Sequence, residues 1–181
     1  MSKRILCLDA CIFQAENKPD RIYREGVLES VQRLMSEIDT GSVFAIMPAT
    51  IAIELLDDAI DLLLRRNDNR KCRIVEVDIK TARLARDIRN KFTRKTRDAI
   101  KQLELPDCIY VATAIHYECE ALVTRDGEGN RRHNLLNVAN EVRREYGIKI
   151  LHPMEACPPP PPPDQPILPH TVDTHEEDRS G

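Results

Sequence analysis

Short apolar runs alternate with longer stretches of helical periodicity along most of this chain. The apolar runs predict strands at residues 4–8, 42–47, 73–77, 121–124 and 148–151. Apolar side chains at helical spacing predict helices over residues 20–39, 48–63, 79–103 with a break near 93–97, 106–118 and 131–146. Parallel strands need long crossover connections, so this alternation predicts an α/β fold, a three-layer sandwich with a central parallel sheet flanked by helices.

The last part of the chain has a different composition. We expect residues 1–154 to form one domain and residues 155–181 to be a proline-rich, acidic, disordered tail. Six prolines occupy 158–163, and five acids with one arginine from Asp164 onward give this end a net charge of −4. The whole chain carries −3, so the remainder is slightly basic. The tail is interpreted either as an inert extension or as a ligand for a partner's aromatic groove.

Cysteine usage and hydropathy indicate a cytoplasmic location. None of the six cysteines forms a C-x-x-C pair, and we interpret them as buried free thiols in a reducing compartment. Lys3 and Arg4 are followed by only four apolar residues, too few for a secretory signal, and no apolar run is long enough to span a bilayer.

Acidic residues follow two of the predicted strands directly. Asp9 comes after the strand at 4–8, and Asp126 comes after the strand at 121–124. The carboxyl ends of parallel strands meet at one edge of a sheet, where sites of α/β proteins form. Glu54 and Asp107 lie near the starts of helices that face the same edge. Four crowded carboxylates repel one another unless a cation offsets their charge, and Mg²⁺ or Mn²⁺ prefers oxygen ligands.

Each acid taken alone has an ordinary structural explanation. Asp9 and Asp126 suit turns, and Asp107 after Pro106 suits the first turn of a helix. The helical periodicity places Glu54 on a solvated face, opposite the stripe Ala52, Leu55, Leu56 and Ala59. The combination of the four acids favours a metal site.

Three segments carry a family resemblance. The runs "ILCLDA", "PATIAIELL" and "LPDCIYVATAIHYECEALVTRD" resemble, in this order, the PIN-domain ribonucleases, and in particular the VapC-like toxins. The resemblance spans residues 4–152. It implies a parallel sheet flanked by helices, Mg²⁺- or Mn²⁺-dependent cleavage of RNA, frequent homodimers and, for toxins, a cognate antitoxin protein.

The resemblance also implies roles for single residues. Asp9, Glu54, Asp107 and Asp126 match the family's catalytic acids, with Asp9, Asp107 and Asp126 as metal ligands and Glu54 holding or orienting a metal-bound water. Ala10 departs from the family pattern, which often has a hydroxyl there, and a fifth oxygen ligand could come from Glu128 or Asn130. The proline-rich tail is not part of the usual toxin.

Basic residues concentrate between Lys80 and Lys101, where nine bases face two acids for a net charge of +7. Such a segment suits phosphates, although on charge alone a solvated helix face or a surface for an acidic partner is the better explanation. Beside a metal site, RNA contact is the better explanation, and the candidate contacts are Arg83, Arg86, Arg94, Arg97 and Arg125.

Two other function classes remain open. One is a catalytically silent PIN scaffold that binds RNA or a protein. The other is a phosphotransfer protein, but Cys11 occupies the second acidic position of a D-x-D phosphatase motif. No histidine pairs with a serine or cysteine nucleophile, which argues against a catalytic triad.

Overall fold

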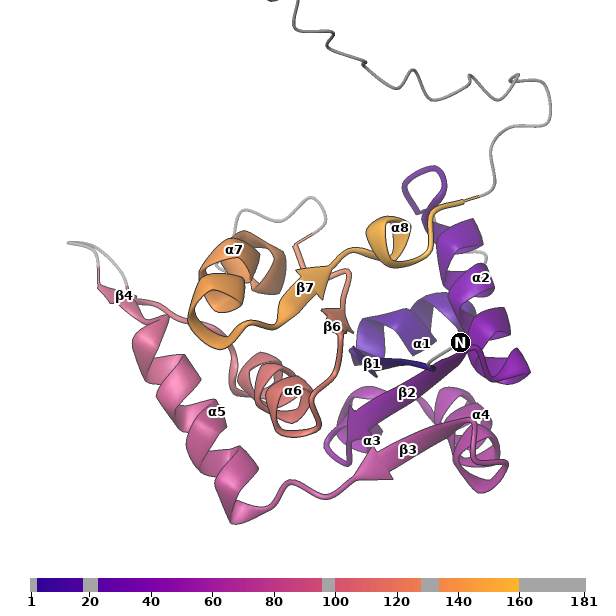
Figure 1. The fold of residues 1–181 in the computed structure, drawn as a ribbon, viewed down its shortest axis with the longest axis horizontal. Coiled ribbons are helices and arrows are strands. Elements are labelled where there is room, and N and C mark those ends of the chain that lie inside the picture. Colours follow the sequence, from indigo (N-terminus) through magenta and orange to yellow (C-terminus); the bar gives the residue numbers. More distant parts are fainter. Residues whose placement is uncertain (1–2, 18–22, 96–99, 128–133, 160–181) are drawn as a thin grey trace, which may run out of the picture.

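A parallel sheet organises the computed structural model, which describes residues 3–17, 23–95, 100–127 and 134–159. Five strands pair in the order β3-β2-β1-β6-β7, and every neighbouring pair is parallel (Figure 1). Their bounds are β1 (Arg4–Leu8), β2 (Val43–Pro48), β3 (Cys72–Val75), β6 (Ala121–Val123) and β7 (Lys149–Leu151). The predicted α/β architecture with a central parallel sheet is confirmed.

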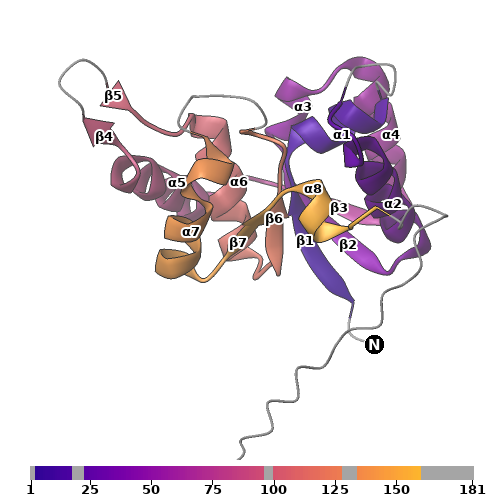
Figure 2. The ribbon, with the colours of Figure 1, turned by 90° about the horizontal axis from the view of Figure 1, so that it is seen from above.

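Helices cover both faces of this sheet, as Figure 2 shows. One layer holds α1 (Ala10–Asn17), α2 (Val27–Thr40), α3 (Ile51–Glu54) and α4 (Asp57–Asp68). The opposite layer holds α5 (Ile79–Lys91), α6 (Leu105–His116) and α7 (Leu135–Tyr146). The short helix α8 (Pro153–Ala156) packs on α2, and Cys157 after it is buried. Within the described residues, no helix combines the length and the apolar character that crossing a membrane requires.

The prediction of one continuous helix over 48–63 is wrong. The chain forms α3 and α4 instead, because Leu55 and Leu56 adopt extended backbone angles between them. Leu55 and Ala59 of the predicted apolar stripe are buried, with Ile51 and Leu63 at the same four-residue spacing, while Ala52 and Leu56 are exposed. Glu54 is half-buried at the end of α3 rather than on a solvated face.

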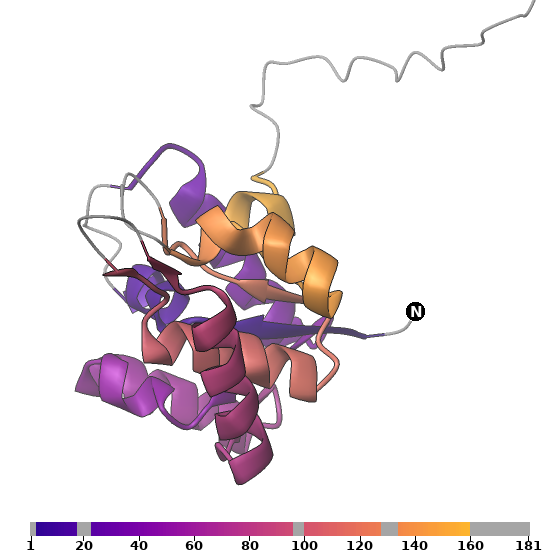
Figure 3. The ribbon, with the colours of Figure 1, turned by 90° about the vertical axis from the view of Figure 1, so that its left-hand side faces the viewer.

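Three other helix predictions differ at their boundaries. The helix predicted over 20–39 begins at Val27, and the one predicted over 131–146 begins at Leu135 behind an Asn134 cap. The helix predicted over 79–103 ends at Lys91, and the antiparallel strands β4 (Arg94–Lys95) and β5 (Ile100–Lys101) follow (Figure 3). Helix α1 was not predicted, because it is short and directly follows the first strand.

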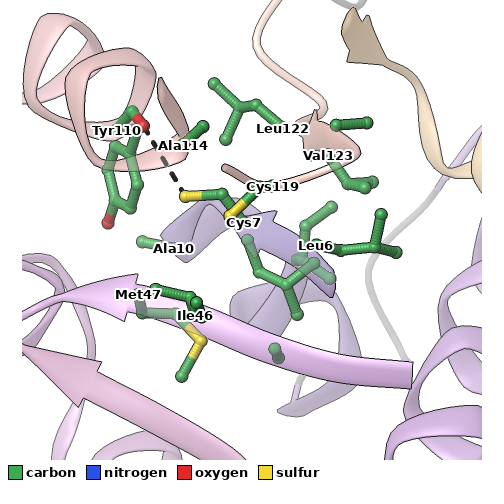
Figure 4. Packing of buried hydrophobic residues seen from close by; sticks show 14 of the residues in the cluster. Leu6, Cys7, Ala10, Ile46, Met47, Tyr110, Ala114, Cys119, Leu122 and Val123 are labelled. Atoms are coloured by element: carbon green, nitrogen blue, oxygen red, sulfur yellow. Dashed lines mark hydrogen bonds between the residues drawn. The ribbon is translucent and has the colours of Figure 1, made fainter. Parts of the chain in front are cut away.

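The core joins the central strands to α6. Cys7 of β1 and its register partner Leu122 of β6 are fully buried on the face toward α6, while Leu6 of β1 and Met47 of β2 are fully buried on the other face (Figure 4). The Cys7 thiol donates to the backbone carbonyl of Tyr110 at 3.6 Å. All six cysteines are free thiols and all but Cys11 are buried, as their apolar sequence surroundings indicated. This packing fixes α6, which carries Asp107, against the strands that carry Asp9 and Asp126.

Candidate active site

Asp9 begins the site at the carboxyl end of β1. Its backbone N–H donates to the Val123 carbonyl at 3.1 Å, which holds the residue against β6. The carboxylate is buried, and its Oδ2 accepts from the Thr124 hydroxyl at 2.5 Å and from the Cys11 thiol at 3.2 Å. Burial raises the pKa of Asp9, and these hydrogen bonds oppose that rise.

Asp126 lies at the neighbouring carboxyl end, after β6. Its backbone N–H donates to the Thr124 hydroxyl at 2.9 Å, and its Oδ2 accepts from the backbone N–H of Leu135 at 2.9 Å. Leu135 is the first residue of α7, so the helix start orients this carboxylate. Thr124 contacts both acids, since its hydroxyl donates to Asp9 while accepting from the backbone of Asp126.

Asp107 joins them from the first turn of α6. Its pKa is raised to about 8, first by burial and then by the negative charges of Asp126, Asp9 and Glu104. The pKa of Asp126 is raised as well, by burial and by the charges of Asp9 and Glu104. Carboxylates from three separate elements therefore act on one another electrostatically.

Glu54 reaches the same region from the end of α3. Its Oε1 accepts from the Tyr110 hydroxyl at 3.0 Å, while its backbone carbonyl accepts from the Gln14 amide at 3.0 Å. The pKa of Glu54 is raised by burial and by the charges of Asp9 and Glu104, against the hydrogen bond from Tyr110. All four acids predicted from the sequence thus lie within one negatively charged region.

The chemistry of this set suits a hard divalent cation, because every predicted ligand offers carboxylate oxygens. Nevertheless, within the described residues no three acidic, cysteine or histidine side chains are already gathered as a group that could hold a metal ion. The acids share one electrostatic region without forming a complete ligand shell.

Comparison with known proteins places this architecture in a family. The model of the PIN domain matches residues 7–133, which include all four acids. The chain belongs to the PIN domain family. No curated protein matches its sequence.

One solved structure similar to this PIN domain is described as VapBC2 from Rickettsia felis bound to a DNA fragment from their promoter. The similarity covers 82% of this chain and 98% of that chain, with 13% sequence identity and a TM-score of 0.49. A likeness this distant carries no argument about activity or partners. The resemblance to PIN domains noted in the sequence is confirmed by the family match.

Several residues around the acids were not named as candidate site residues from the sequence. Glu104, the residue before α6, adds negative charge to the surroundings of Asp107, Asp126 and Glu54. Thr124 and Tyr110 orient carboxylates, and Cys11 contacts Asp9. Spacing from the predicted acids was the available signal, because Thr124 lies two residues before Asp126 and Tyr110 lies one helical turn after Asp107.

The predicted RNA contacts are scattered in the structure. Arg125 is half-buried, with its guanidinium carbon 4.5 Å from the centroid of the Tyr23 ring. Arg83 and Arg86 are exposed on α5, and Arg86 lies 3.8 Å from the Asp87 carboxylate. Arg94 lies in β4, where side chains fall outside the described structure. Three further residues named from the sequence, Arg97, Glu128 and Asn130, lie outside the residues that the structure describes.

Proposed function

We propose that this PIN domain is a Mg²⁺- or Mn²⁺-dependent endoribonuclease. Asp9, Asp107 and Asp126 would hold the ion, directly or through water, and Glu54 would orient the attacking water. The observation that supports this proposal is the electrostatic convergence of these acids, with the pKa of Asp107 raised to about 8 beside Asp9 and Asp126. Membership of the PIN family supports it independently.

The chain's own residues prepare the chemistry. When bound, the ion supplies an acidified water and positive charge near the phosphoryl oxygens. Thr124 fixes the Asp9 carboxylate, and the α7 start fixes that of Asp126. The Tyr110 hydroxyl fixes Glu54, whose raised pKa brings the carboxylate closer to the range in which a general base works at neutral pH.

Cleavage of single-stranded RNA with and without Mn²⁺ tests the proposal. The variants are Asp9→Asn and Asp126→Asn, and Asp58→Asn on the exposed side of α4 is the matched control. Wild type and the control are expected to cut the RNA only with Mn²⁺, while both site variants fall to the background. Equal background in all four proteins would reject the nuclease.

We further propose that the nuclease is the toxin of a toxin–antitoxin pair and forms homodimers, as the VapC-like motif pattern suggests. Expression of the chain alone should then arrest bacterial growth, and co-expression of a small DNA-binding protein encoded beside it should relieve the arrest. Growth arrest without relief would point to a solitary nuclease.

Sedimentation analysis tests the proposed homodimer and would show a species of twice the chain mass if the dimer forms.

A catalytically silent PIN scaffold is the second candidate. It is favoured by the lack of a ready three-ligand group within the residues that the structure describes. The two candidates differ in one measurement, because a silent scaffold would bind RNA without any Mn²⁺-dependent product.

A further inference from the structure

A polar groove of about 600 Å³ lies beyond the edge strand of the sheet. One wall is a single face of α7 that includes Leu136, Asn140 and Arg143, and the other is the β7 segment from Lys149 to His152. Arg24, Gly127 and Glu155 complete the lining. We call this the α7–β7 groove. Apart from Arg24 and Gly127, the residues named here lie outside the span that matches the PIN family.

Positive charge dominates the α7–β7 groove. Arg24, Arg143 and Lys149 are exposed, and no ion pair involving any of the three occurs within the described part of the chain. Glu155 also lines the groove and offsets part of this charge, while its Oε2 accepts from the His152 backbone in the α8 capping box and it forms no ion pair with the three cations in the described structure. By contrast, Arg66 outside the groove contacts both Glu16 and Asp39. The groove therefore presents three cations to an anionic ligand.

The α7–β7 groove borders the acid site at Gly127, the residue after Asp126. In the sheet order, β7 comes next after β1 and β6, the strands that Asp9 and Asp126 follow. Gly127, the neighbour of Asp126, lines the groove with φ at +120°, and a Cβ there would lie 2.6 Å from Asn134 Oδ1. Glycine keeps this junction free of a side chain.

A second connection runs through Arg125. Its guanidinium lies over the Tyr23 ring, and Arg24, the next residue after Tyr23, lines the groove. Positive side chains therefore extend from beside Asp126 into the groove.

We infer that the α7–β7 groove binds the phosphodiester backbone of single-stranded RNA as the strand leaves the acid site. This inference rests on the proposed nuclease function. Neither Phe, Tyr nor Trp is among the described lining residues, so the contacts are with phosphates and carry little base preference. The route differs from the basic segment at 80–101 that the sequence indicated.

An acidic peptide is the competing occupant of such a groove. The chain itself supplies one, because the described residues end at Pro159, whose Cγ would lie 3.3 Å from a Cβ on Gly26 near Arg24. The acids from Asp164 onward follow. RNA is the better match because Gly127 and Arg125, the residues on either side of Asp126, connect the acid site to the groove, the first as a lining residue and the second through Tyr23 beside Arg24.

The test measures binding of a fluorescein-labelled, mixed-sequence single-stranded RNA to the full chain by anisotropy, in EDTA. The groove variant is Arg143→Gln with Lys149→Gln. The matched control is Arg65→Gln with Lys71→Gln, two cations that line a pocket near β3 at the opposite edge of the sheet. Both variants remove two positive charges, so only position distinguishes them.

Loss of two phosphate contacts should make the slope of log affinity against log salt less negative by about 1.4 in the groove variant, with little change in the control. Equal slopes in the two variants would overturn the inference. If hydrogen exchange at β7 then depends on the acids after Asp164, the groove belongs to the chain's own acidic segment.

Because binding is measured without a divalent ion, the result is separable from the proposed nuclease activity. If the salt slope becomes less negative only in the groove variant and wild type shows no Mn²⁺-dependent cleavage, the groove binds RNA and the nuclease proposal is rejected. If wild type cleaves RNA normally and the two variants have equal salt slopes, the nuclease proposal stands and RNA binding by the groove is rejected.

Discussion

The acid site lies at the carboxyl ends of β1 and β6, the α7–β7 groove lies along the edge strand β7, and the two regions treat charge in opposite ways. In the acid site, like charges are crowded and half-buried or buried, and hydrogen bonds from Thr124 and Tyr110 hold them in place. In the groove, the cations Arg24, Arg143 and Lys149 are exposed and spread over separate elements. Precise orientation therefore matters in the first region, whereas total charge matters in the second.

Thr124→Val should have the largest effect of the changes considered, because it disturbs the orientation of the carboxylates in the acid site. Valine keeps the shape but loses the hydroxyl that donates to Asp9 and accepts from the Asp126 backbone. We expect cleavage to fall about 100-fold, equivalent to ~2.7 kcal/mol, while RNA affinity in EDTA changes little. Thr124→Ser keeps the hydroxyl and should retain most activity. A Thr124→Val enzyme as active as Thr124→Ser would contradict this role.

Gly127→Ala tests the junction between the two regions. The alanine Cβ would lie 2.6 Å from Asn134 Oδ1, which accepts from Asn137 at the start of α7, and the positive φ adds backbone strain. The free energy of unfolding should fall by about 2 kcal/mol. The control is Gly41→Ala, at φ +83° with nothing within 4 Å of the new Cβ, and about 1 kcal/mol is expected there. If urea denaturation shows that both variants lose the same free energy of unfolding, the close contact between residue 127 and Asn134 contributes nothing to the effect.

The pH dependence of stability sharpens the electrostatic contrast. In the folded protein the pKa of Asp107 is raised from 3.8 to about 8, so the folded state binds the proton more tightly than the unfolded chain. Stability of the ion-free protein is therefore greatest below pH 4 as far as this group is concerned, and is lost as the pH rises toward 8. This group contributes at most ~1.4 kcal/mol per pH unit in that window.

Urea denaturation at several pH values, with and without Asp107→Asn, measures this contribution. The variant should show a flatter decline, and Mn²⁺ should reduce the decline in wild type. A steeper loss of stability in Asp107→Asn would contradict the assignment.

Tyr110→Phe should give the smallest effect. The change removes the hydrogen bond to Glu54 Oε1 and leaves the buried ring, whose loss would disturb the core. We expect a several-fold fall in the maximal cleavage rate, about 1 kcal/mol, with unchanged RNA affinity. A weakened affinity instead would place Tyr110 on the RNA path.

The sequence predicted the acid site better than the groove for physical reasons. Asp9, Asp107 and Asp126 stand at the ends of short, strongly apolar elements, whose order defines the sheet edge. The break directly after Glu54 was not predicted, because Leu55 and Leu56 have extended backbone angles within a pattern that periodicity treats as one helix.

The α7–β7 groove gave no local signal. Arg24 lies far from Arg143 and Lys149 in the chain, and only the folded structure places it in the groove beside α7 and β7. The dense bases at 80–101 drew attention instead, yet the chain divides them between α5 and the β4–β5 pair.

Calorimetric titration of the full chain with Mn²⁺ tests the central claim most directly, because it asks whether the converging carboxylates bind a divalent ion. Wild type should show saturable binding that disappears in an Asp9→Asn, Asp126→Asn double variant and persists in Asp58→Asn. Identical titrations for wild type and the double variant would contradict the account.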